Sequence, residues 1–259
     1  MRGTLGRLAA FGRRSLRRRR FQAYCIGTAK SGTASIAEIF RPGYRVGHEP
    51  DAELLIERIL SSAAERGERA DADFLRARDR RLRLELDSSQ LNLYLAENLA
   101  RTFPRAQFIL TVREPLDWVD SFINHQLSRP ASEVWRRFRD HRFLRGPNEQ
   151  QEEQVLREHG LYTLEGYLSY WSWHNQRALE VIPAERLLVL RTRELGTSIP
   201  RLAEFLQIPA STLAPGKAHA NRARTQLGIL GQLPGEYLDA MVRRHCGVLM
   251  QRFFPEQGP

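Results

Sequence analysis

The chain has 259 residues and a formal net charge of +10, and its contents of 42% hydrophobic and 27% charged residues are those of a folded domain rather than a disordered chain. No apolar run approaches the roughly 18 residues of a membrane span. The two cysteines, Cys25 and Cys246, are too few and too far apart for a disulfide framework or a zinc site. We therefore expect one globular domain in a reducing, cytoplasmic setting.

The excess of positive charge lies at the N-terminus. Residues 1–20 contain eight arginines and no acid, which leaves a net charge of +2 on the other 239 residues. We expect a basic arm over 1–20, either flexible and solvated or forming a short amphipathic helix that contacts an anionic membrane or nucleic acid. No secretory or twin-arginine signal is predicted, because no apolar stretch follows the arginines.

Residues 21–259 alternate between predicted strands and predicted helices. Short apolar runs indicate strands at 22–27, 82–86, 106–112 and 187–190. Apolar residues at helical spacing indicate helices at 31–40, 51–66, 90–103, from Pro115 onward, and at 164–182, 198–206 and 234–254. This order predicts an α/β fold with a central, mostly parallel sheet of four to five strands flanked by helices.

Two segments do not fit the alternation. Residues 65–80 are rich in charge and are interpreted as a connection. Residues 130–160 are polar with few apolar anchors, and we interpret them as a lid or acceptor-side insertion within a single domain, with a surface excursion of no function as the alternative.

The turn after the first strand carries the groups of an anion site. It reads GTAKSGTAS from Gly27 to Ser35 and leads into a helix, whose first N–H groups and dipole favour negative charge. Three hydroxyls, of Ser31, Thr33 and Ser35, add hydrogen-bond donors. Lys30 adds a compact positive charge, which is notable because only two of the 40 basic residues are lysine.

This loop is not a Walker A motif. Gly27 and Gly32 have the required spacing, but Thr33 stands where the motif needs lysine. The strand 106–112 ends in Arg113 rather than in an acid, and Asp87 is a weak candidate for a Mg²⁺ ligand. A P-loop kinase or NTPase stays open as an alternative, as does a nucleotide-binding protein whose arm contacts nucleic acid or a membrane. The low charge of the body argues against a specific nucleic-acid partner.

A second motif follows the buried strand 106–112. Arg113-Glu114-Pro115 ends this strand, and Ser121 lies about two turns into the next helix. Open α/β sheets bind ligands at the carboxyl ends of their strands, and arginine binds phosphate with two parallel hydrogen bonds. This motif therefore indicates a second phosphate contact.

Together, KSGT in the first loop and R-[DE]-P with a serine eight residues after the arginine resemble the sulfotransferases that use 3′-phosphoadenosine-5′-phosphosulfate (PAPS), in their bacterial and carbohydrate-type branch. The resemblance covers about residues 21–225. It implies a three-layer fold related to P-loop kinases, PAPS as donor, PAP as product, and no metal. It assigns the 5′-phosphosulfate to the first loop and the 3′-phosphate to Arg113 and Ser121. The donor-binding candidates are Lys30, Ser31, Gly32, Thr33, Ala34, Ser35, Arg113, Ser121, Lys217, Asn221 and Arg222.

The chain departs from the family pattern at three places. Ala34 stands where the family often has a second threonine, and Ser35 where many cytosolic members have a tryptophan that stacks on adenine. The C-terminal loop of the 3′-phosphate site is often Arg-Lys-Gly, whereas this chain has the looser match from Lys217 to Arg222.

The resemblance also implies in-line sulfuryl transfer to a hydroxyl or amine, with Lys30 beside the leaving phosphate. The acceptor needs a base, for which the family uses His or Glu. We expect Glu49 first, His48 second, and Glu85 or Asp87 third. The acceptor itself, a carbohydrate, a lipid or a small metabolite, is not specified by any motif.

Overall fold

The computed structural model describes residues 18–257 apart from 62, 145–149 and 219–225. Most of the predicted basic arm therefore lies outside the described residues. Its last two arginines are bound to the domain: Arg19 forms an ion pair with Asp79 (Nη1 to Oδ1, 2.8 Å), and Arg20 forms one with Glu85 (Nε to Oε1, 3.0 Å).

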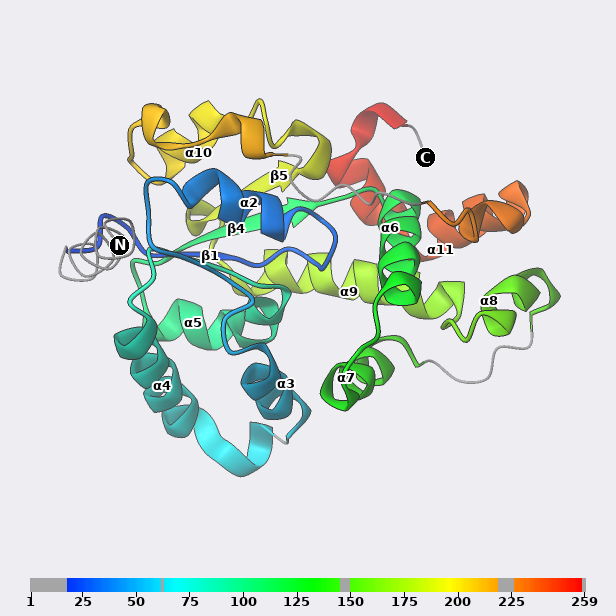
Figure 1. Ribbon diagram of the computed structural model, residues 1–259, viewed down its shortest axis with the longest axis horizontal. Helices are drawn as coiled ribbons and strands as arrows, with labels where there is room; N and C mark the ends of the chain where they lie inside the picture. The colour runs from blue at the N-terminus through cyan, green and yellow to red at the C-terminus, as the bar shows by residue number, and fades with distance from the viewer. Residues whose placement is uncertain (1–17, 62, 145–149, 219–225, 258–259) are drawn as a thin grey trace, which may run out of the picture.

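A five-stranded parallel sheet forms the centre of the molecule. The strands are β1 (Ala23–Cys25), β2 (Val46–His48), β3 (Leu86–Ser88), β4 (Gln107–Val112) and β5 (Leu187–Arg191). They lie in the order β2-β3-β1-β4-β5, and each neighbouring pair is parallel. Because all strands run the same way, the loops that follow them meet at one edge of the sheet (Figure 1).

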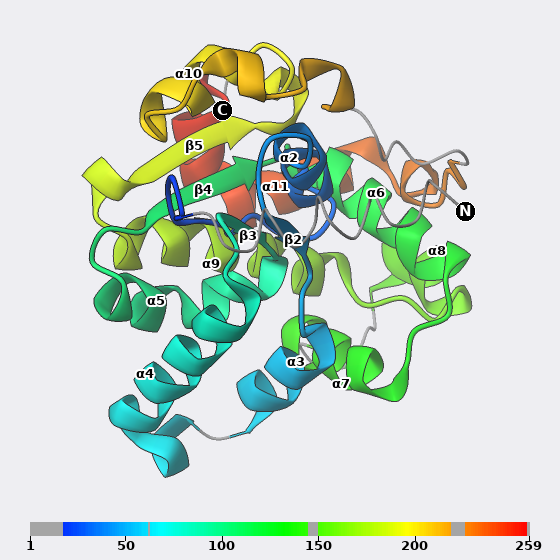
Figure 2. The ribbon, with the colours of Figure 1, turned by 60° about the vertical axis from the view of Figure 1, so that its left-hand side comes forward.

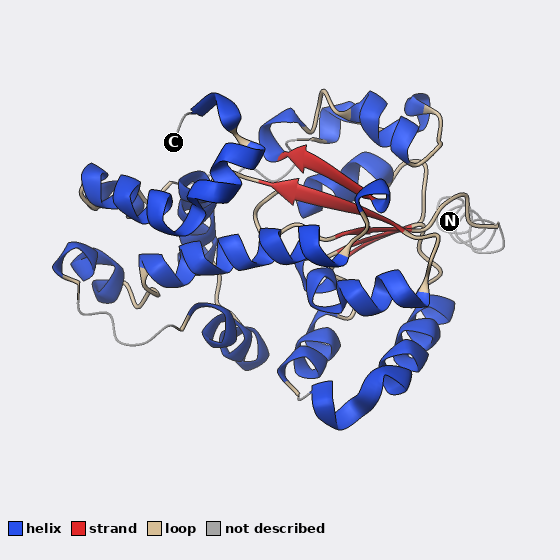
Figure 3. Ribbon diagram, turned by 180° about the vertical axis from the view of Figure 1, so that it is seen from behind, coloured by secondary structure: helices blue, strands red, loops and turns tan. Residues whose placement is uncertain are grey.

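The described residues hold ten α-helices in two layers, one on each side of the sheet (Figures 2 and 3). They are α2 (Thr33–Phe40), α3 (Ala52–Leu60), α4 (Ala63–Leu82), α5 (Ala96–Thr102), α6 (Pro115–Ser128), α7 (Glu133–Phe143), α8 (Gln154–Glu158), α9 (Leu164–Val181), α10 (Ile199–Phe205) and α11 (Gly235–Phe253). Short 3₁₀ turns are η1 (Gln90–Leu95), η2 (Gln151–Glu153), η3 (Ala184–Arg186), η4 (Thr192–Glu194), η5 (Ala210–Thr212), η6 (Pro215–Lys217), η7 (Leu230–Gln232) and η8 (Pro255–Gln257).

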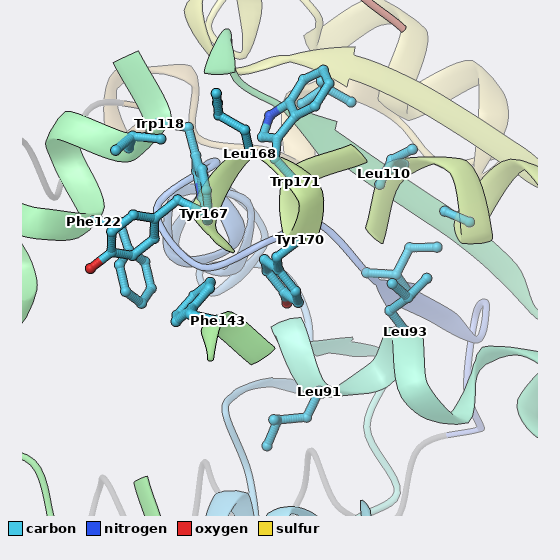
Figure 4. Packing of buried hydrophobic residues seen from close by; sticks show 14 of the residues in the cluster. Leu91, Leu93, Leu110, Trp118, Phe122, Phe143, Tyr167, Leu168, Tyr170 and Trp171 are labelled. Atoms are coloured by element: carbon cyan, nitrogen blue, oxygen red, sulfur yellow. The ribbon is translucent and has the colours of Figure 1, made fainter. Parts of the chain in front are cut away.

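The two faces of the sheet bury separate apolar clusters. On one face α2 and α10 pack over the sheet, with Ile36, Phe40 and Leu202 fully buried. On the other face the larger cluster gathers side chains from α3, α5, α6, α7, α9 and α11. Figure 4 shows its aromatic centre, where rings from α6, α7 and α9 lie against one another: Trp118, Phe122, Phe143, Tyr167 and Tyr170. Buried aromatic rings supply much of the apolar area that stabilises a core of this size.

The sequence predictions of an α/β fold and a mostly parallel sheet are confirmed. The predicted helices at 31–40, 164–182, 198–206 and 234–254 are each found to within two residues of their ends, and a helix begins at Pro115 as predicted. Strand β2 was not predicted, because its three residues leave no apolar run to detect.

Two local predictions were wrong. Residues 65–80 form most of helix α4, because Leu75 is buried and charges that look solvated in sequence form ion pairs, such as Arg58 with Asp71. The strand predicted at 82–86 begins only at Leu86, since Arg83 takes a positive φ of 46° at the end of α4. Within 130–160, helix α7 buries Phe138 and Phe143 in the core, and the interpretation of this segment as a lid or acceptor-side insertion stays a prediction.

Arg186, in η3 just before β5, connects this part of the chain with α5 and with the start of β4. It lies at the amino end of the sheet, opposite the loops described above. Its guanidinium donates to the carbonyls of Ala106 (2.9 Å), Ala100 (3.1 Å) and Phe103 (2.9 Å). These carbonyls lie at the end of α5 and just before β4, and half-buried carbonyls left without a donor are costly.

We expect Arg186→Met to lower the free energy of unfolding by about 1.5–3 kcal/mol, because three charge-assisted hydrogen bonds are lost. Urea unfolding followed by circular dichroism measures the change. The matched control is Arg201→Met, whose exposed guanidinium bonds one carbonyl, that of Val189, at 3.3 Å; its effect is expected to stay within about 0.5 kcal/mol. Equal effects of the two substitutions would contradict this reading of Arg186.

Candidate active site

The loop between β1 and α2 is held against β4. A Cβ on Gly27 would lie 2.0 Å from Oγ1 of Thr111, so only glycine allows this approach. The hydroxyl of Ser31 donates to the carbonyl of Thr28 (2.7 Å) and lies 2.9 Å from Oγ1 of Thr111. The Ser31 hydroxyl is therefore engaged inside the protein, where it fixes the shape of the loop, and its predicted role in donor binding stays a prediction.

Two further side chains fix the path of this loop. The indole of Trp118 on α6 donates from Nε1 to the carbonyl of Ala29 (2.6 Å). The hydroxyl of Thr192, after β5, donates to the carbonyls of Ser31 and Val112. Because the carbonyls of Ala29 and Ser31 accept these hydrogen bonds, the loop is held in one backbone conformation. In this conformation Lys30 has a φ of 66°.

Helix α2 begins without a cap. Gly32 precedes it with a φ of 113°, no side chain caps the first N–H groups, and the first turn has no acid. The side chains of Thr33 and Ser35 are buried beside this helix start, and Ala34 is half-buried. Free N–H groups at the start of a helix bind anions.

Positive charge accumulates next to this helix start. Burial, followed by the charges of Arg113 and Arg129, lowers the pKa of Lys30. Burial, followed by the charge of Lys30 and then of Arg129, lowers the pKa of His125 to about 4. In the described part of the chain no carboxylate forms an ion pair with Lys30, Arg113 or Arg129. An anion placed among these groups would relieve their mutual repulsion.

Arg113 directly follows β4, and Ser121 lies on α6, the next helix. The carbonyl of Arg113 accepts a hydrogen bond from Nε1 of Trp171 on α9 (2.9 Å), which fixes the end of β4. Ser121 is buried in the second turn of α6. One turn further, Oδ1 of Asn124 accepts from the backbone N–H of Leu227 (2.7 Å).

The predicted C-terminal loop is described only in part. Lys217 is exposed at the end of η6, whose preceding residue Ala214 bonds the carbonyl of Ile39 on α2 (3.0 Å). Asn221 and Arg222 lie outside the described residues. The chain before them thus lies beside α2, and the chain after them lies beside α6 at Asn124.

Glu49 follows β2 directly and turns toward the loops after β3. Its carboxylate accepts hydrogen bonds from the hydroxyl of Ser89 (2.9 Å) and from the backbone N–H (3.3 Å) and amide (3.4 Å) of Gln90. Burial raises the pKa of Glu49, and these hydrogen bonds oppose the rise. A carboxylate with a raised pKa is a stronger proton acceptor than an ordinary glutamate.

The other candidate bases are differently placed. His48, at the end of β2, is largely exposed to solvent. Partial desolvation of its ring and then the charge of Arg41 lower its pKa, whereas the charge of Glu38 on α2 raises it. His48 is the last residue of β2, whereas Glu49 follows it with a positive φ of 53° and has its carboxylate bonded to Ser89 and Gln90. Asp87 is buried in an ion pair with Arg78 (2.6 Å).

Glu85 precedes β3, at the amino end of the sheet rather than at the loop edge. It binds Arg20 and the backbone N–H of Arg45. Its contacts, like those of Asp87, are structural, and neither carboxylate lies free beside the first loop.

Sequence analysis missed several residues that build the site. Trp118, Trp171 and Thr192 bond loop carbonyls from α6, α9 and η4, and Gln90 bonds Glu49 from η1. Each is distant in sequence from its partner, and an ordinary Trp, Thr or Gln in a helix carries no local signal of such a contact.

The family model of the sulfotransferase domain matches residues 24–221. The chain belongs to this family. No curated protein matches the sequence. The match spans β1, the first loop, the Arg113 motif and β5, which together form the edge of the sheet described above.

Three solved structures are similar to this sulfotransferase-family chain. The sulfotransferase from Alicyclobacillus acidocaldarius shares 17% identity over 89% of this chain and 94% of its own, with a TM-score of 0.52. Mouse sulfotransferase SULT7A1 complexed with PAP shares 15% over 94% and 88%, with a TM-score of 0.40. Sulfotransferase STF9 from Mycobacterium avium shares 13% over 96% and 81%, with a TM-score of 0.47. Only the first likeness is strong enough to support an inference, and it concerns the fold.

The fold is accordingly the P-loop-kinase-like α/β fold of sulfotransferases, as predicted. Across the residues that the structure covers, no helix is both long and apolar enough to cross a membrane. Over the same residues, no group of three or more His, Cys, Asp or Glu side chains is arranged to hold a metal ion.

We expect Gly27→Ala to destabilise the protein by about 1–3 kcal/mol, because the added methyl group would overlap Thr111. Thermal and urea unfolding measure the loss. Gly247→Ala is the control: it lies within α11 with no atom within 4 Å of its new Cβ, so helix propensity predicts a gain of about 0.5–1 kcal/mol. A Gly27→Ala variant as stable as the parent chain would contradict the close approach of the first loop to β4.

Proposed function

We propose that this protein transfers a sulfuryl group from PAPS to a hydroxyl or amine of an acceptor, giving PAP and a sulfated product. One observation carries the proposal. The uncapped start of α2 lies beside Lys30 and near Arg113, and the structure describes no acid paired with either cation. The family assignment supports a sulfotransferase, and this cluster supports a donor with more than one anionic group.

In the proposed donor site, the backbone N–H groups of Gly32, Thr33, Ala34 and Ser35 hold the oxygens of the 5′-phosphosulfate. Arg113 and Ser121 hold the 3′-phosphate, with Lys217, Asn221 and Arg222 as further candidates. The buried loop excludes water and is fixed before the donor binds, so its donors do not reorganise during the reaction. Lys30 stabilises the negative charge that grows on the bridging oxygen as the sulfur–oxygen bond of PAPS breaks.

Glu49 is the proposed base. It removes the proton from the acceptor hydroxyl or amine as the acceptor oxygen or nitrogen bonds to sulfur, and PAP leaves with the electron pair of the broken bond. The hydrogen bonds from Ser89 and Gln90 orient its carboxylate. The acceptor class, among carbohydrates, lipids and small metabolites, stays open.

The kinase alternative loses its proposed acid. Asp87, the only acid that sequence analysis put forward for Mg²⁺, is buried against Arg78. Contact of residues 1–20 with an anionic membrane stays a prediction, because residues 1–17 lie outside the described part of the chain. A cytoplasmic location also stays a prediction.

Calorimetry with PAP tests the donor site. We expect Lys30→Ala and Arg113→Ala each to weaken PAP binding by about 10- to 100-fold, the value of one charge-assisted contact. ATP, which lacks a 3′-phosphate, should bind more weakly than PAP. The control is Arg137→Ala, an exposed arginine on α7 paired with Glu57, which should leave PAP affinity unchanged. PAP binding that survives both substitutions would overturn the proposed donor site.

A screen of acceptors with labelled PAPS tests the base. With any acceptor that is sulfated, we expect Glu49→Gln to slow turnover by about 10²- to 10⁴-fold without changing PAP affinity. Since a base must be ionised, activity of the parent chain should be full above the raised pKa of Glu49 and fall as the pH drops through it. Glu57→Gln, an exposed acid on α3, is the control. A large loss in His48→Ala with none in Glu49→Gln would transfer the role to His48.

A further inference from the structure

Arg142 is a buried cation without an acid partner. Its side chain on α7 is 3% exposed, and no ion pair of this guanidinium is found among the described residues. It lies over the rings of Phe138 (4.3 Å from the centroid), Phe143 (4.7 Å) and Tyr170 (5.3 Å). Burying a charge is costly, and contacts with aromatic faces offset only part of that cost. A further role for Arg142 would explain why the charge is kept.

The strong polar contact of Arg142 is with Gln90. Nη1 of Arg142 donates to Oε1 of Gln90 at 2.6 Å. Arginine has donors and no acceptor, so the oxygen of the Gln90 amide must face Arg142. The NH₂ group of the same amide then faces Glu49, with Nε2 3.4 Å from Oε1 of the carboxylate. Gln90 is itself only 6% exposed.

These contacts form a series of hydrogen bonds from Arg142 on α7 through Gln90 in η1 to Glu49, the residue after β2. We propose that Arg142 and Gln90 are positioning residues for Glu49: Arg142 fixes the Gln90 amide so that it donates to the carboxylate and holds it oriented and ionised. This inference rests on the proposed function only in naming Glu49 as the base. The chain of hydrogen bonds itself is independent of the donor and of the acceptor.

Other groups also act on Glu49. Burial and the charge of Asp87 on β3 raise its pKa, while the Ser89 hydroxyl and both donors of Gln90 lower it. Asp87 is paired with Arg78 of α4. The thiol of Cys25 on β1 is near enough to be affected by Glu49, and burial holds its own pKa at about 11, so it stays neutral. If the Gln90 amide is removed, fewer groups counteract the effects of burial and of Asp87, so the pKa of Glu49 should rise.

Carbon-13 NMR of protein labelled at the glutamate side-chain carboxyl measures the pKa of Glu49, with Glu49→Gln to assign its signal. We expect Gln90→Met, which keeps the size of the side chain and removes its polar group, to raise this pKa by one unit or more, so that at a given pH the ratio of ionised to protonated carboxyl falls at least tenfold. Arg142→Met should raise it in the same direction. The controls are Gln176→Met and Arg177→Met, on the exposed side of α9, which should leave it unchanged.

The double variant Gln90→Met/Arg142→Met shows whether Arg142 acts on Glu49 through Gln90 or independently of it. If Arg142 acts through Gln90, Arg142→Met should add little to Gln90→Met, whereas independent effects would add. Circular dichroism checks that each variant folds, and Gln90→Met, a neutral replacement, decides the matter if Arg142→Met does not fold. An unchanged pKa of Glu49 in folded Gln90→Met, or full additivity in the double variant, would overturn the proposal.

The same samples distinguish this inference from the proposed function. Calorimetry with PAP reports the donor site, and it should give the parent affinity in Gln90→Met and Arg142→Met. If PAP does not bind the parent chain, the proposed function fails whatever the pKa of Glu49. A different result is that PAP binds the parent chain and Glu49→Gln is inactive, while the pKa of Glu49 is the same in Gln90→Met and Arg142→Met as in the parent. In that case only the positioning role of Arg142 and Gln90 fails.

Discussion

The close approach of Gly27 to Thr111 is the constraint on which the site depends. It brings the loop after β1 against β4, where the hydroxyls of Ser31 and Thr111 lie 2.9 Å apart. Since Arg113 follows the same strand two residues later, this one contact sets the spacing between the start of α2 and the end of β4. Trp118 and Thr192 hold the loop from two further elements. These contacts fix the backbone of the loop that we propose as part of the donor site.

Charge is distributed unequally around this constraint. Several acids of the fold are paired with arginines, as Asp87 is with Arg78 and Glu85 with Arg20. The loop edge itself collects Lys30 and Arg113 without described acid partners, and burial depresses the pKa of Lys30. Such an edge is stabilised by a bound anion. The net charge of the body is small, so the anion binding that we propose depends on where these cations lie and not on overall charge.

Much of the fold could be predicted, because long apolar patterns at helical spacing survive in any tertiary context. Helices α6, α9 and α11 were of this kind. The errors fell where tertiary contacts overrode composition. Helix α4 looked like a charged connection, since its arginines and acids pair with residues far away in sequence, and strand β2 is too short to carry a pattern. The contact of the Ser31 hydroxyl with Thr111, eighty residues away, could not be predicted from the local sequence either.

The amino-acid sequence by itself determined the fold class, the family, and the first loop and Arg113 motif as the candidate donor site, because these depend on local spacing along the chain. Only the tertiary structure showed how the candidate bases are placed, because their contacts join residues far apart in the sequence: Glu49 accepts hydrogen bonds from Ser89 and Gln90, whereas Asp87 is paired with Arg78. It also revealed the chain from Arg142 through Gln90 to Glu49. A buried hydrogen bond between residues fifty positions apart leaves no local pattern, and its existence depends on how α7 packs against η1.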